Sequence, residues 1–450
     1  MILLCDRYSQ ESQDLQASLQ SVGQAITTVV IEADGFLPEG VLSPFTYFVE
    51  ERREGDNPLY FNQVPVPDFW EIAGDNQSAS ISKDTVKKAH IAYADAQRPR
   101  LVKQVDWYNE SGQVRQSDHY HRYGYRYAQT TYAADGSRIF TRYVTRQGQE
   151  RILENHVTGD ILLTLENQPL QHFKNRIAFV QFFLRQLDPE LKGILFNTLA
   201  TPFLVSFYLP EKTGRDVLIW QEPLGDEIPG NMQLVLEDND LRANTVVIPN
   251  RATYERALEL TPVEQHHKIF PLGYHYQFKR DNHVRKDTLI VTNSDQIEQL
   301  ETIVASLPDV TFRIAAVTEM SSKLTSMIAY PNVILYQNAS QQQIEELYQL
   351  SDVYLDINYA NELLHAVRRA FDHNLVIFAF EETAHNRTYL APENTFTKDN
   401  LAGLLDRIQL ALASVEGMTE VLIAQGRHAN YMDADSCRLQ FEEIIGEQHG

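Results

Sequence analysis

The chain has 450 residues, 43% of them hydrophobic and 22% charged, which is ordinary globular composition with room for two or three domains. Its formal net charge of −22 excludes a general nucleic-acid binder, because a polyanion would be repelled. Two cysteines, Cys5 and Cys437, are too few for a disulfide framework and favour a reducing cytosol.

The N-terminus and the apolar runs bear on localisation. The first residues, MILLCDRYSQ, lack the basic n-region of a signal peptide. No run approaches the roughly 20 apolar residues of a spanning helix. We therefore expect a cytoplasmic protein, and peripheral contact with the cytoplasmic face of the cell membrane stays open.

Residues 1–42 read as strand, helix and strand. MILLCD is a buried strand, SQESQDLQASLQSVG is a helix that stops at Gly23, and AITTVVIE is β-branched. This order begins a parallel sheet. The α/β pattern returns at 175–272, and we assign both stretches to one N-terminal Rossmann-like domain.

Residues 43–174 differ in composition and are rich in Tyr, Thr and Arg. The turn sequences NESG (109–112), AADGS (133–137) and RQGQ (146–149) separate alternating runs. These are hairpin signals, and they predict an inserted, extended antiparallel β-sheet domain. The alternation of Tyr123, Tyr125 and Tyr127 predicts that all three lie on one sheet face.

Residues 273–450 are the most regular part. The apolar runs TLIVTN, VTFRIAAV, NVILYQN, VYLDIN and LVIFAF alternate with helical patterns such as DQIEQLETIVASL. This order predicts a second, C-terminal Rossmann-like domain, with a final helix that could pack on either half. Two such domains would face each other across a cleft at the carboxyl ends of their strands.

The stretch from PNVILYQN to LVIFAF resembles the donor region of retaining glycosyltransferases of the GT-B architecture. In that comparison, the glycine expected after NVILY is Gln337. The two glutamates of the family motif fall at Asn361, beside Glu362, and at Arg369. The loop glycines fall within 362–365.

These differences from the glycosyltransferase motif affect how a diphosphate could be bound. A diphosphate is held by backbone N–H groups that glycine leaves accessible, and by cations. The domain has no glycine between Gly273 and Gly403, and no Lys or Arg between Lys286 and Arg313. The sequence therefore predicts no bound cofactor and a lost donor site. The alternative is an active retaining GT-B enzyme with a divergent UDP-sugar site that uses Arg368 or Arg369.

Polar residues after the predicted strands are the candidates for binding an acceptor or its sugar. For the residues between 220 and 231, the alternative is a loop that caps a helix. For Asn293, Ser294 and Asp295, the alternative is helix capping. The candidates are Trp220, Gln221, Glu222, Asn231, Asn293, Ser294, Asp295, Asn358 and Glu362.

The Tyr- and Arg-rich run of the insert supplies candidates for a partner interface, where these residue types are favoured. A core face is the competing interpretation for its tyrosines. The candidates are Tyr123, Tyr125, Arg126 and Tyr127. His119 and His121 alternate on the same run, but no third ligand is evident, and we predict no metal site.

Longer stretches extend the resemblance over nearly the whole chain. They include VVIEADGFLPEGVLSPFTYF, PLYFNQVPVPDFWEI, DHYHRYGYRYA, LIVTNSDQIEQLE and SDVYLDINYANELL. The chain resembles the stabilising, non-catalytic subunit of the bacterial O-linked N-acetylglucosaminyltransferase that glycosylates serine-rich repeat adhesins.

The resemblance implies a complex with a homologous catalytic glycosyltransferase subunit that carries the UDP-GlcNAc site. It also implies binding of the Ser/Thr-rich adhesin polypeptide and its GlcNAc-modified form before export by the accessory Sec route. We therefore predict a pseudo-glycosyltransferase with no catalytic residue. A purely structural scaffold is a further alternative, and the stoichiometry stays open.

Overall fold

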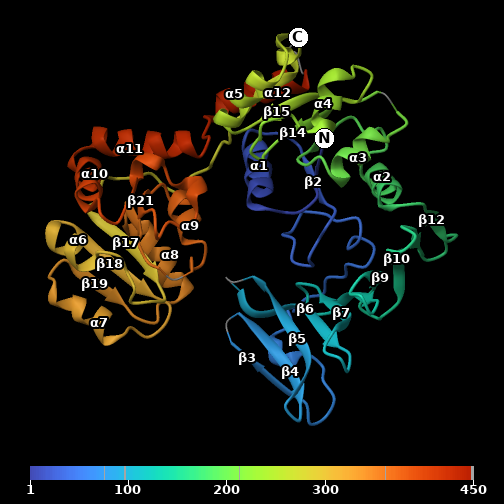
Figure 1. The fold of residues 1–450 in the computed structure, drawn as a ribbon, viewed down its shortest axis with the longest axis horizontal. Helices are drawn as coiled ribbons and strands as arrows, with labels where there is room; N and C mark the ends of the chain where they lie inside the picture. Colours follow the sequence, from blue (N-terminus) through green and yellow to red (C-terminus); the bar gives the residue numbers. More distant parts are fainter. Residues whose placement is uncertain (76, 96–97, 212, 360, 447–450) are drawn as a thin grey trace. The chain divides into compact units, whose positions relative to one another are not determined.

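Two parallel sheets and one long antiparallel sheet make up the chain (Figure 1). The computed structural model describes residues 1–75, 77–95, 98–211, 213–359 and 361–446. One compact unit consists of Met1–Leu272 with the segment from Asp435, and the second consists of Gly273–Ala434. The predicted fold class, GT-B-like α/β with an inserted antiparallel sheet, is confirmed.

The first unit contains a six-stranded parallel sheet in the order β16-β15-β14-β13-β1-β2. Every residue of β1, β13 and β14 is buried, as expected for a parallel sheet covered on both faces. The strands are β1 (Ile2–Cys5), β2 (Thr27–Val30), β13 (Ile194–Phe196), β14 (Asp216–Ile219), β15 (Ala243–Ile248) and β16 (Ile269–Pro271).

Polar caps set where the helices of this unit begin. The Ser9 hydroxyl accepts from the N–H of Ser12 at the start of α1, and the Asn175 side chain accepts from Ala178 at the start of α2. The helices are α1 (Gln10–Ser21), α2 (Arg176–Leu187), α3 (Thr201–Phe207), α4 (Gly230–Glu237), α5 (Arg251–Leu260) and α12 (Ala434–Ile445).

The final helix, α12, belongs to the first unit. The Sγ atom of Cys437 lies 3.7 Å from the Ser18 hydroxyl of α1. Cys5 and Cys437 are both buried and free. Among the described residues, no helix combines the length and apolarity needed to cross a membrane.

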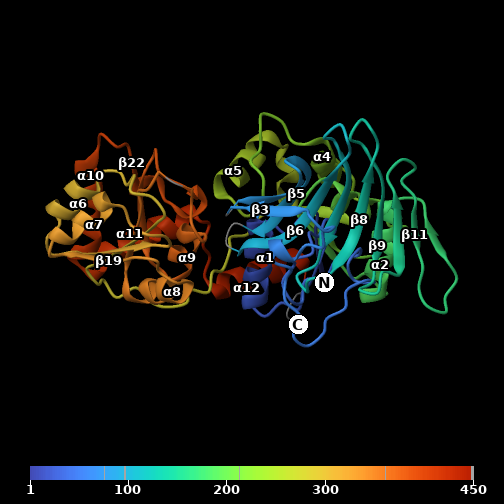
Figure 2. The same ribbon diagram turned by 90° about the horizontal axis from the view of Figure 1, so that it is seen from below.

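The insert is a ten-stranded antiparallel meander, and several of its strands lie side by side in Figure 2. Its strands are β3 (Glu71–Gly74), β4 (Ser78–Lys83), β5 (Val86–Asp95), β6 (Arg98–Tyr108), β7 (Val114–Tyr120), β8 (Arg126–Tyr132), β9 (Arg138–Val144), β10 (Glu150–Asn155), β11 (Ile161–Leu163) and β12 (Gln171–Phe173). The three predicted hairpin turns are confirmed, since Gly112, Gly136 and Gly148 each supply the left-handed residue of a turn.

One expectation within the insert is wrong. Tyr123 and Tyr125 lie in the turn before β8, which begins only at Arg126. The N–H of Gly124 donates to the His121 carbonyl and closes this turn, so the period-two alternation is not that of a strand here. Packing nevertheless brings Tyr123, Tyr125 and Tyr127 into one cluster.

The segment that follows β2 fastens the insert to the parallel sheet. Gly35 has φ +84°, and a Cβ atom there would lie 2.6 Å from the carbonyl oxygen of Tyr120. Its own carbonyl accepts from the N–H of Arg122 at 2.9 Å. Farther along, Phe45 stacks on Tyr143 with ring centroids 5.1 Å apart.

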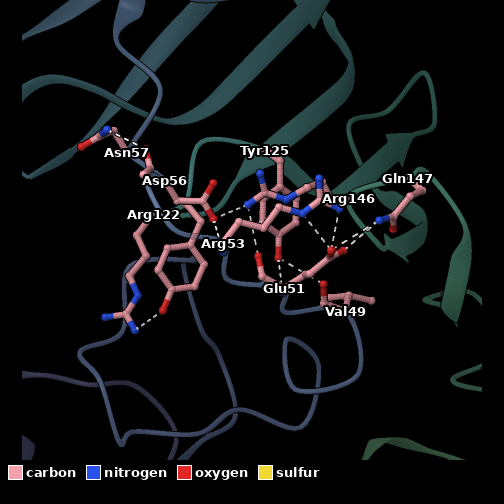
Figure 3. Close-up of polar contacts among 11 residues, drawn as sticks. Val49, Glu51, Arg53, Asp56, Asn57, Arg122, Tyr125, Arg146 and Gln147 are labelled. Atoms are coloured by element: carbon pink, nitrogen blue, oxygen red, sulfur yellow. Dashed lines mark hydrogen bonds and ion pairs between the residues drawn. The ribbon is translucent and has the colours of Figure 1, made fainter.

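A polar cluster anchors the next part of this segment (Figure 3). The Tyr125 hydroxyl accepts from the N–H of Glu51 at 2.9 Å and donates to the Val49 carbonyl at 3.1 Å. The guanidinium of Arg146 lies 4.6 Å from the centre of the Tyr125 ring and pairs with Asp56. Tyr125 is therefore a structural anchor between loop and sheet.

The second unit contains a parallel sheet in the order β19-β18-β17-β20-β21-β22. Its strands confirm the five predicted apolar runs and add β22. They are β17 (Asp287–Thr292), β18 (Thr311–Ala316), β19 (Val333–Tyr336), β20 (Val353–Asp356), β21 (Val376–Phe380) and β22 (Thr395–Phe396).

Left-handed residues directly precede two helices of this unit, and α6 therefore starts later than the predicted helix DQIEQLETIVASL. Gln299 has φ +51° before α6, and His365 has φ +49° before α9. The helical hairpin α10–α11 follows the last strand. The helices are α6 (Leu300–Ser306), α7 (Ser322–Thr325), α8 (Gln341–Leu350), α9 (Ala366–Asp372), α10 (Leu401–Ala413) and α11 (Val415–His428).

A buried aspartate–arginine pair lies in each unit. Asp216 accepts from the Ile194 N–H at 2.9 Å, and Arg242 donates two bonds of 3.0 Å to its carboxylate. In the second unit, Asp352 accepts from the His283 N–H at 3.0 Å and pairs with Arg280. Each carboxylate therefore connects a strand to its neighbouring chain segments.

We expect Asp216→Asn to destabilise the first unit by roughly 3–5 kcal/mol, because Arg242 would keep its buried charge and lose its counter-ion. Urea unfolding followed by circular dichroism measures the change. Glu190→Gln, in an exposed pair with Lys192, is the matched control and should change stability little. An unfolding midpoint for Asp216→Asn equal to that of the unchanged chain would contradict this role.

Candidate functional site

The strand order of the second unit creates a topological switch point between β17 and β20. The chain leaves β17 towards β18 on one side and leaves β20 towards β21 on the other. Connections that diverge in this way leave a crevice at the carboxyl ends of the strands, where α/β proteins bind ligands. Residues that follow Thr292 and Asp356 therefore decide whether this crevice is open.

Main-chain hydrogen bonds tie the two loops at this switch point together. The N–H of Glu298 donates to the Ile357 carbonyl at 2.7 Å, and the N–H of Tyr359 donates to the Gln296 carbonyl at 2.9 Å. Ile297 and Asn358 form an isolated antiparallel bridge between them. The two loops are therefore held together by their backbones at the switch point.

The sequence-predicted residues of these loops are partly brought together. Asn358 is 3% exposed; its Nδ2 lies 3.5 Å from the Val291 carbonyl, and its Oδ1 has no hydrogen-bond partner in the described part of the chain. Asn293, Ser294 and Asp295 do not cap α6, which begins five residues later. Ser294 instead forms a local turn, with its N–H on the Thr292 hydroxyl at 3.0 Å.

The turn before α9 keeps a glycine-like backbone without glycine. Leu364 and His365 have φ of +52° and +49°, the left-handed region that glycine adopts most readily. The Glu362 carboxylate accepts from the N–H of Val367 at 3.0 Å. Burial raises the pKa of Glu362, and the neighbouring Asp356 raises it further. An acid therefore caps the helix where a phosphate would bind in a nucleotide enzyme.

Both arginines of α9 are engaged within the unit. Arg368 donates to Asp372 at 2.7 Å and to the Tyr389 hydroxyl at 2.5 Å. Arg369 pairs with Glu345 and lies 5.1 Å from the centre of the Tyr348 ring.

Glu345 is the acid that holds Arg369 in place. Burial favours its neutral form, but hydrogen bonds from Arg369 and Lys279 outweigh burial and lower the pKa of Glu345 to about 2. The carboxylate also lies 3.0 Å from the His373 ring. Freeing Arg369 for a phosphate would leave this partly buried charge with one partner fewer.

Unsatisfied polar atoms gather at the carboxyl ends of β13 and β14 in the first unit. Trp220 is 6% exposed, and its indole N–H has no partner among the described residues. The Asn197 amide donates to Ser12 at 2.9 Å and to Gln221 at 3.1 Å, while its Oδ1 likewise lacks a described partner. This corner offers a buried donor and a buried acceptor, and the Thr198 hydroxyl next to Asn197 also lacks a described partner.

The remaining predicted residues of the first unit lie around this corner. Gln221 donates to the Glu11 carbonyl at 2.9 Å, and Asn231 donates to the Leu199 carbonyl at 3.0 Å. Glu222 is exposed. Asn197 was missed, although the sequence carries a signal for it, because ILFNTL places a polar residue directly after a buried strand.

A cavity of about 970 Å³ lies within the first unit. The segment after β2, the face of the insert sheet and the start of α2 line it. None of the predicted binding residues does so, and of the predicted interface residues only Tyr127 is part of its wall. Sequence reasoning missed this cavity because it depends on how the insert packs.

A chain of hydrogen bonds crosses the cavity floor from strand to strand. The Nε2 of His119 lies 2.9 Å from the Thr130 hydroxyl, which lies 3.0 Å from the Thr141 hydroxyl. The Thr141 hydroxyl lies 2.9 Å from Nε2 of His156. Burial lowers the pKa of His119 to about 4 and lowers that of His156 as well, so both imidazoles are neutral at neutral pH.

The predicted partner interface needs correction. Tyr125 and Tyr127 are 9% and 3% exposed and pack inside the first unit, so their rings do not form a free surface. Arg126 is exposed and pairs with Asp118 at 3.2 Å. Tyr123 is half-buried. The prediction therefore stands only for Tyr123 and Arg126.

His121, one half of the H-x-H pattern, is buried against Tyr123 and Tyr125. Its Nε2 lies 3.6 Å from Glu50. Within the described ranges, no group of three or more His, Cys, Asp or Glu residues is placed to hold a metal ion. The contacts of His119 and His121 are therefore with neighbouring side chains of the first unit.

Comparison with known families covers most of the chain. The matching families are described as the GtfB N-terminal domain (2–48), the GtfB middle domain (70–174), the GtfB third domain (176–260) and the GftB/GlyA-F C-terminal domain (288–425).

Two relatives match over their full length. The protein of Streptococcus pneumoniae serotype 4 named UDP-N-acetylglucosamine--peptide N-acetylglucosaminyltransferase stabilizing protein GtfB is 59% identical over 99% of this chain and 100% of its own. The protein of the same name from Streptococcus gordonii is 53% identical over 100% of both chains.

Solved structures agree. A chain in the crystal structure of a GtfA/B complex bound to UDP and GlcNAc has a TM-score of 0.92 and 53% identity, covering 98% of this chain and 99% of that one. A chain of accessory secretory protein 1, 2 and 3 from Streptococcus pneumoniae has a TM-score of 0.61 at 11% identity and shares the fold alone.

His119 makes the stability of the first unit depend on pH. An unfolded imidazole takes up its proton near pH 6.5, whereas His119 does so near pH 4. As the pH falls between these values the unfolded chain binds more protons, so the free energy of unfolding decreases by up to roughly 3 kcal/mol.

We therefore expect His119→Gln, whose amide can still form a hydrogen bond with Thr130, to lose this part of the acid sensitivity. Thermal unfolding of both proteins at pH 7 and pH 4.5 checks it, because the carboxylates contribute equally to both. If the melting temperatures of both proteins fall equally between pH 7 and pH 4.5, His119 is not held neutral in the folded chain.

Proposed function

Because this chain belongs to the GtfB family of glycosyltransferase-stabilising proteins, we propose that it is the non-catalytic, stabilising and acceptor-binding subunit of a protein O-GlcNAc transferase. It works with a homologous catalytic subunit of the GtfA type. Together they attach GlcNAc to Ser and Thr residues of serine-rich repeat adhesins in the cytoplasm before export. The complex rests peripherally on the cytoplasmic face of the membrane.

The observation that carries the non-catalytic role is the closed switch point of the second unit. Main-chain bonds join Gln296 and Glu298 to the loop after β20. Nearby, Glu362 caps α9 and the two arginines of that helix already bind carboxylates. A UDP-sugar would have to break backbone pairs and approach acids, which makes the alternative of an active enzyme unfavourable.

The corner at the carboxyl ends of β13 and β14 supports acceptor binding. A buried polar group without a partner costs about 1–3 kcal/mol, and a ligand that supplies the partner recovers that cost. The indole N–H of Trp220 and the Oδ1 of Asn197 need an acceptor and a donor respectively. A serine or threonine hydroxyl, or a peptide group, provides both.

The insert sheet supports the role in partner binding. Arg126 is exposed next to the half-buried Tyr123, and both residue types are enriched at protein interfaces. We assign the docking of the catalytic subunit to this domain. Co-expression with the catalytic subunit, followed by size-exclusion chromatography and a transfer assay, tests the assignment.

Calorimetric titration of UDP-GlcNAc into the isolated chain should show no submillimolar binding, because Arg368 and Arg369 are paired with carboxylates and Glu362 caps α9. Arg369→Ala should therefore leave the titration unchanged and only weaken the contacts of Glu345. The catalytic subunit, titrated in parallel, is the positive control. Submillimolar binding that disappears in Arg369→Ala would establish the rival interpretation of an active donor site.

For the acceptor corner, we expect Trp220→Phe to raise the KM of the two-subunit complex for an unmodified Ser/Thr-rich peptide about three- to tenfold. The melting temperature should fall, because Trp220 packs in the core of the first unit and phenylalanine leaves a cavity there, so KM is measured well below that temperature. Trp70→Phe in the insert is the matched control. An unchanged KM would rule out a contact of Trp220 with the acceptor.

A further inference from the structure

The hydrogen-bond chain on the cavity floor begins and ends at a neutral imidazole. His119 lies at one end, on β7, and His156 lies at the other, directly after β10. Burial lowers the pKa of His119 to about 4 and also lowers that of His156. At neutral pH each ring therefore carries one hydrogen, either on Nδ1 or on Nε2, and has two possible tautomers.

Charged groups of both signs act on the two rings. Acids favour the protonated imidazolium and cations oppose it, and burial, which also opposes it, is the largest cause of both pKa shifts. The rings therefore stay neutral in the folded chain. The charged groups are Asp106, Asp118, Glu154, Lys103, Arg138 and Arg176.

A count of hydrogens along the chain restricts the two tautomers. Three hydrogen bonds of 2.9, 3.0 and 2.9 Å join Nε2 of His119, the two threonine hydroxyls and Nε2 of His156. Three bonds need three hydrogens, and Thr130 and Thr141 supply one each. The third comes from one of the histidines, while the other accepts through a bare Nε2. All three bonds therefore form only when the two rings are in opposite tautomers.

Glu154 favours one direction of the chain. Its Oε2 lies 3.9 Å from Nε2 of His156, whereas Arg176 donates to the other carboxylate oxygen, Oε1, at 2.8 Å. A negative charge close to a ring nitrogen favours the hydrogen on that nitrogen. The chain then runs from an Nε2–H on His156, through the two hydroxyls, to a bare Nε2 on His119.

We propose that this chain is a directional switch built into the insert sheet, in which His156 is the donor end, His119 is the acceptor end, and their tautomers change only together. Both histidines line the 970 Å³ cavity. In this direction Nδ1 of His119 is a donor and Nδ1 of His156 is an acceptor. A hydrogen-bonding group that reverses one ring therefore reverses the other, across β8 and β9. The inference does not depend on the proposed function.

Nitrogen NMR reads the two tautomers directly, because a ring nitrogen that carries a hydrogen and a bare one have well-separated shifts. The full-length chain is prepared with isotope-labelled histidine, and loss of signals in His119→Gln and in His156→Gln assigns the two rings. At neutral pH we expect the Nε2–H form for His156 and the Nδ1–H form for His119. Each should be favoured at least about fivefold, because reversal of one ring alone breaks a hydrogen bond.

Thr141→Val tests the coupling, because it removes the middle of the chain without touching His119. We expect His119 to populate both tautomers in this variant, and to keep its Nδ1–H form in Thr141→Ser, which retains the hydroxyl. Thr131→Val is the matched control. Thr131 follows Thr130 on β8, so its side chain lies on the opposite face of the sheet and its loss should leave both rings unchanged.

The same tautomer at both histidines of the unchanged chain, or the reverse pair, overturns the inference. An unchanged His119 tautomer in folded Thr141→Val overturns it as well. Thermal melts show whether each variant is folded. If Thr141→Val is not, the tautomers of the unchanged chain decide by themselves.

Discussion

A buried carboxylate paired with arginine organises each of the two parallel sheets. Asp216 is fully buried with Arg242, and Asp352 is fully buried with Arg280. Each carboxylate also accepts main-chain N–H groups, so it compensates both a buried charge and buried backbone donors. Asp216 opens β14, and Asp352 directly precedes β20, so both pairs lie at the amino ends of strands. The carboxyl ends of the strands are therefore free to differ between the units.

The two units do differ at the carboxyl ends of their strands. In the second unit, the loops after β17 and β20 pair through their backbones and close the switch point, and an acid caps the helix that would face a phosphate. In the first unit, the corresponding edge retains a buried indole N–H and an amide oxygen without described partners. One fold type thus has backbone-paired loops at this edge in one unit and a polar corner at the corresponding edge of the other.

The insert contributes a surface that neither parallel sheet provides. Its sheet packs on the segment after β2 through Gly35, where a side chain would collide with the Tyr120 carbonyl, and through the stack of Phe45 on Tyr143. This packing encloses the large cavity and anchors the following loop through Tyr125 and Arg146. Aromatic residues that appear in the sequence as an exposed interface are therefore mostly core.

The sequence by itself determined the three sheets, the hairpin turns and the absence of glycine from the turn before α9, because these follow from local periodicity and from what a Cβ atom permits. It also pointed to Trp220 and Asn358, since polar residues after buried strands meet at one edge. Only the tertiary structure decided that the loop from Asn293 pairs with the loop after β20, that Tyr125 and Tyr127 are buried, and that a cavity exists. The floor of that cavity joins side chains 11 to 15 residues apart in sequence. Which of them meet depends on the register of neighbouring strands, with bulges near His119 and Thr131, and register is set by long-range packing that no local pattern specifies.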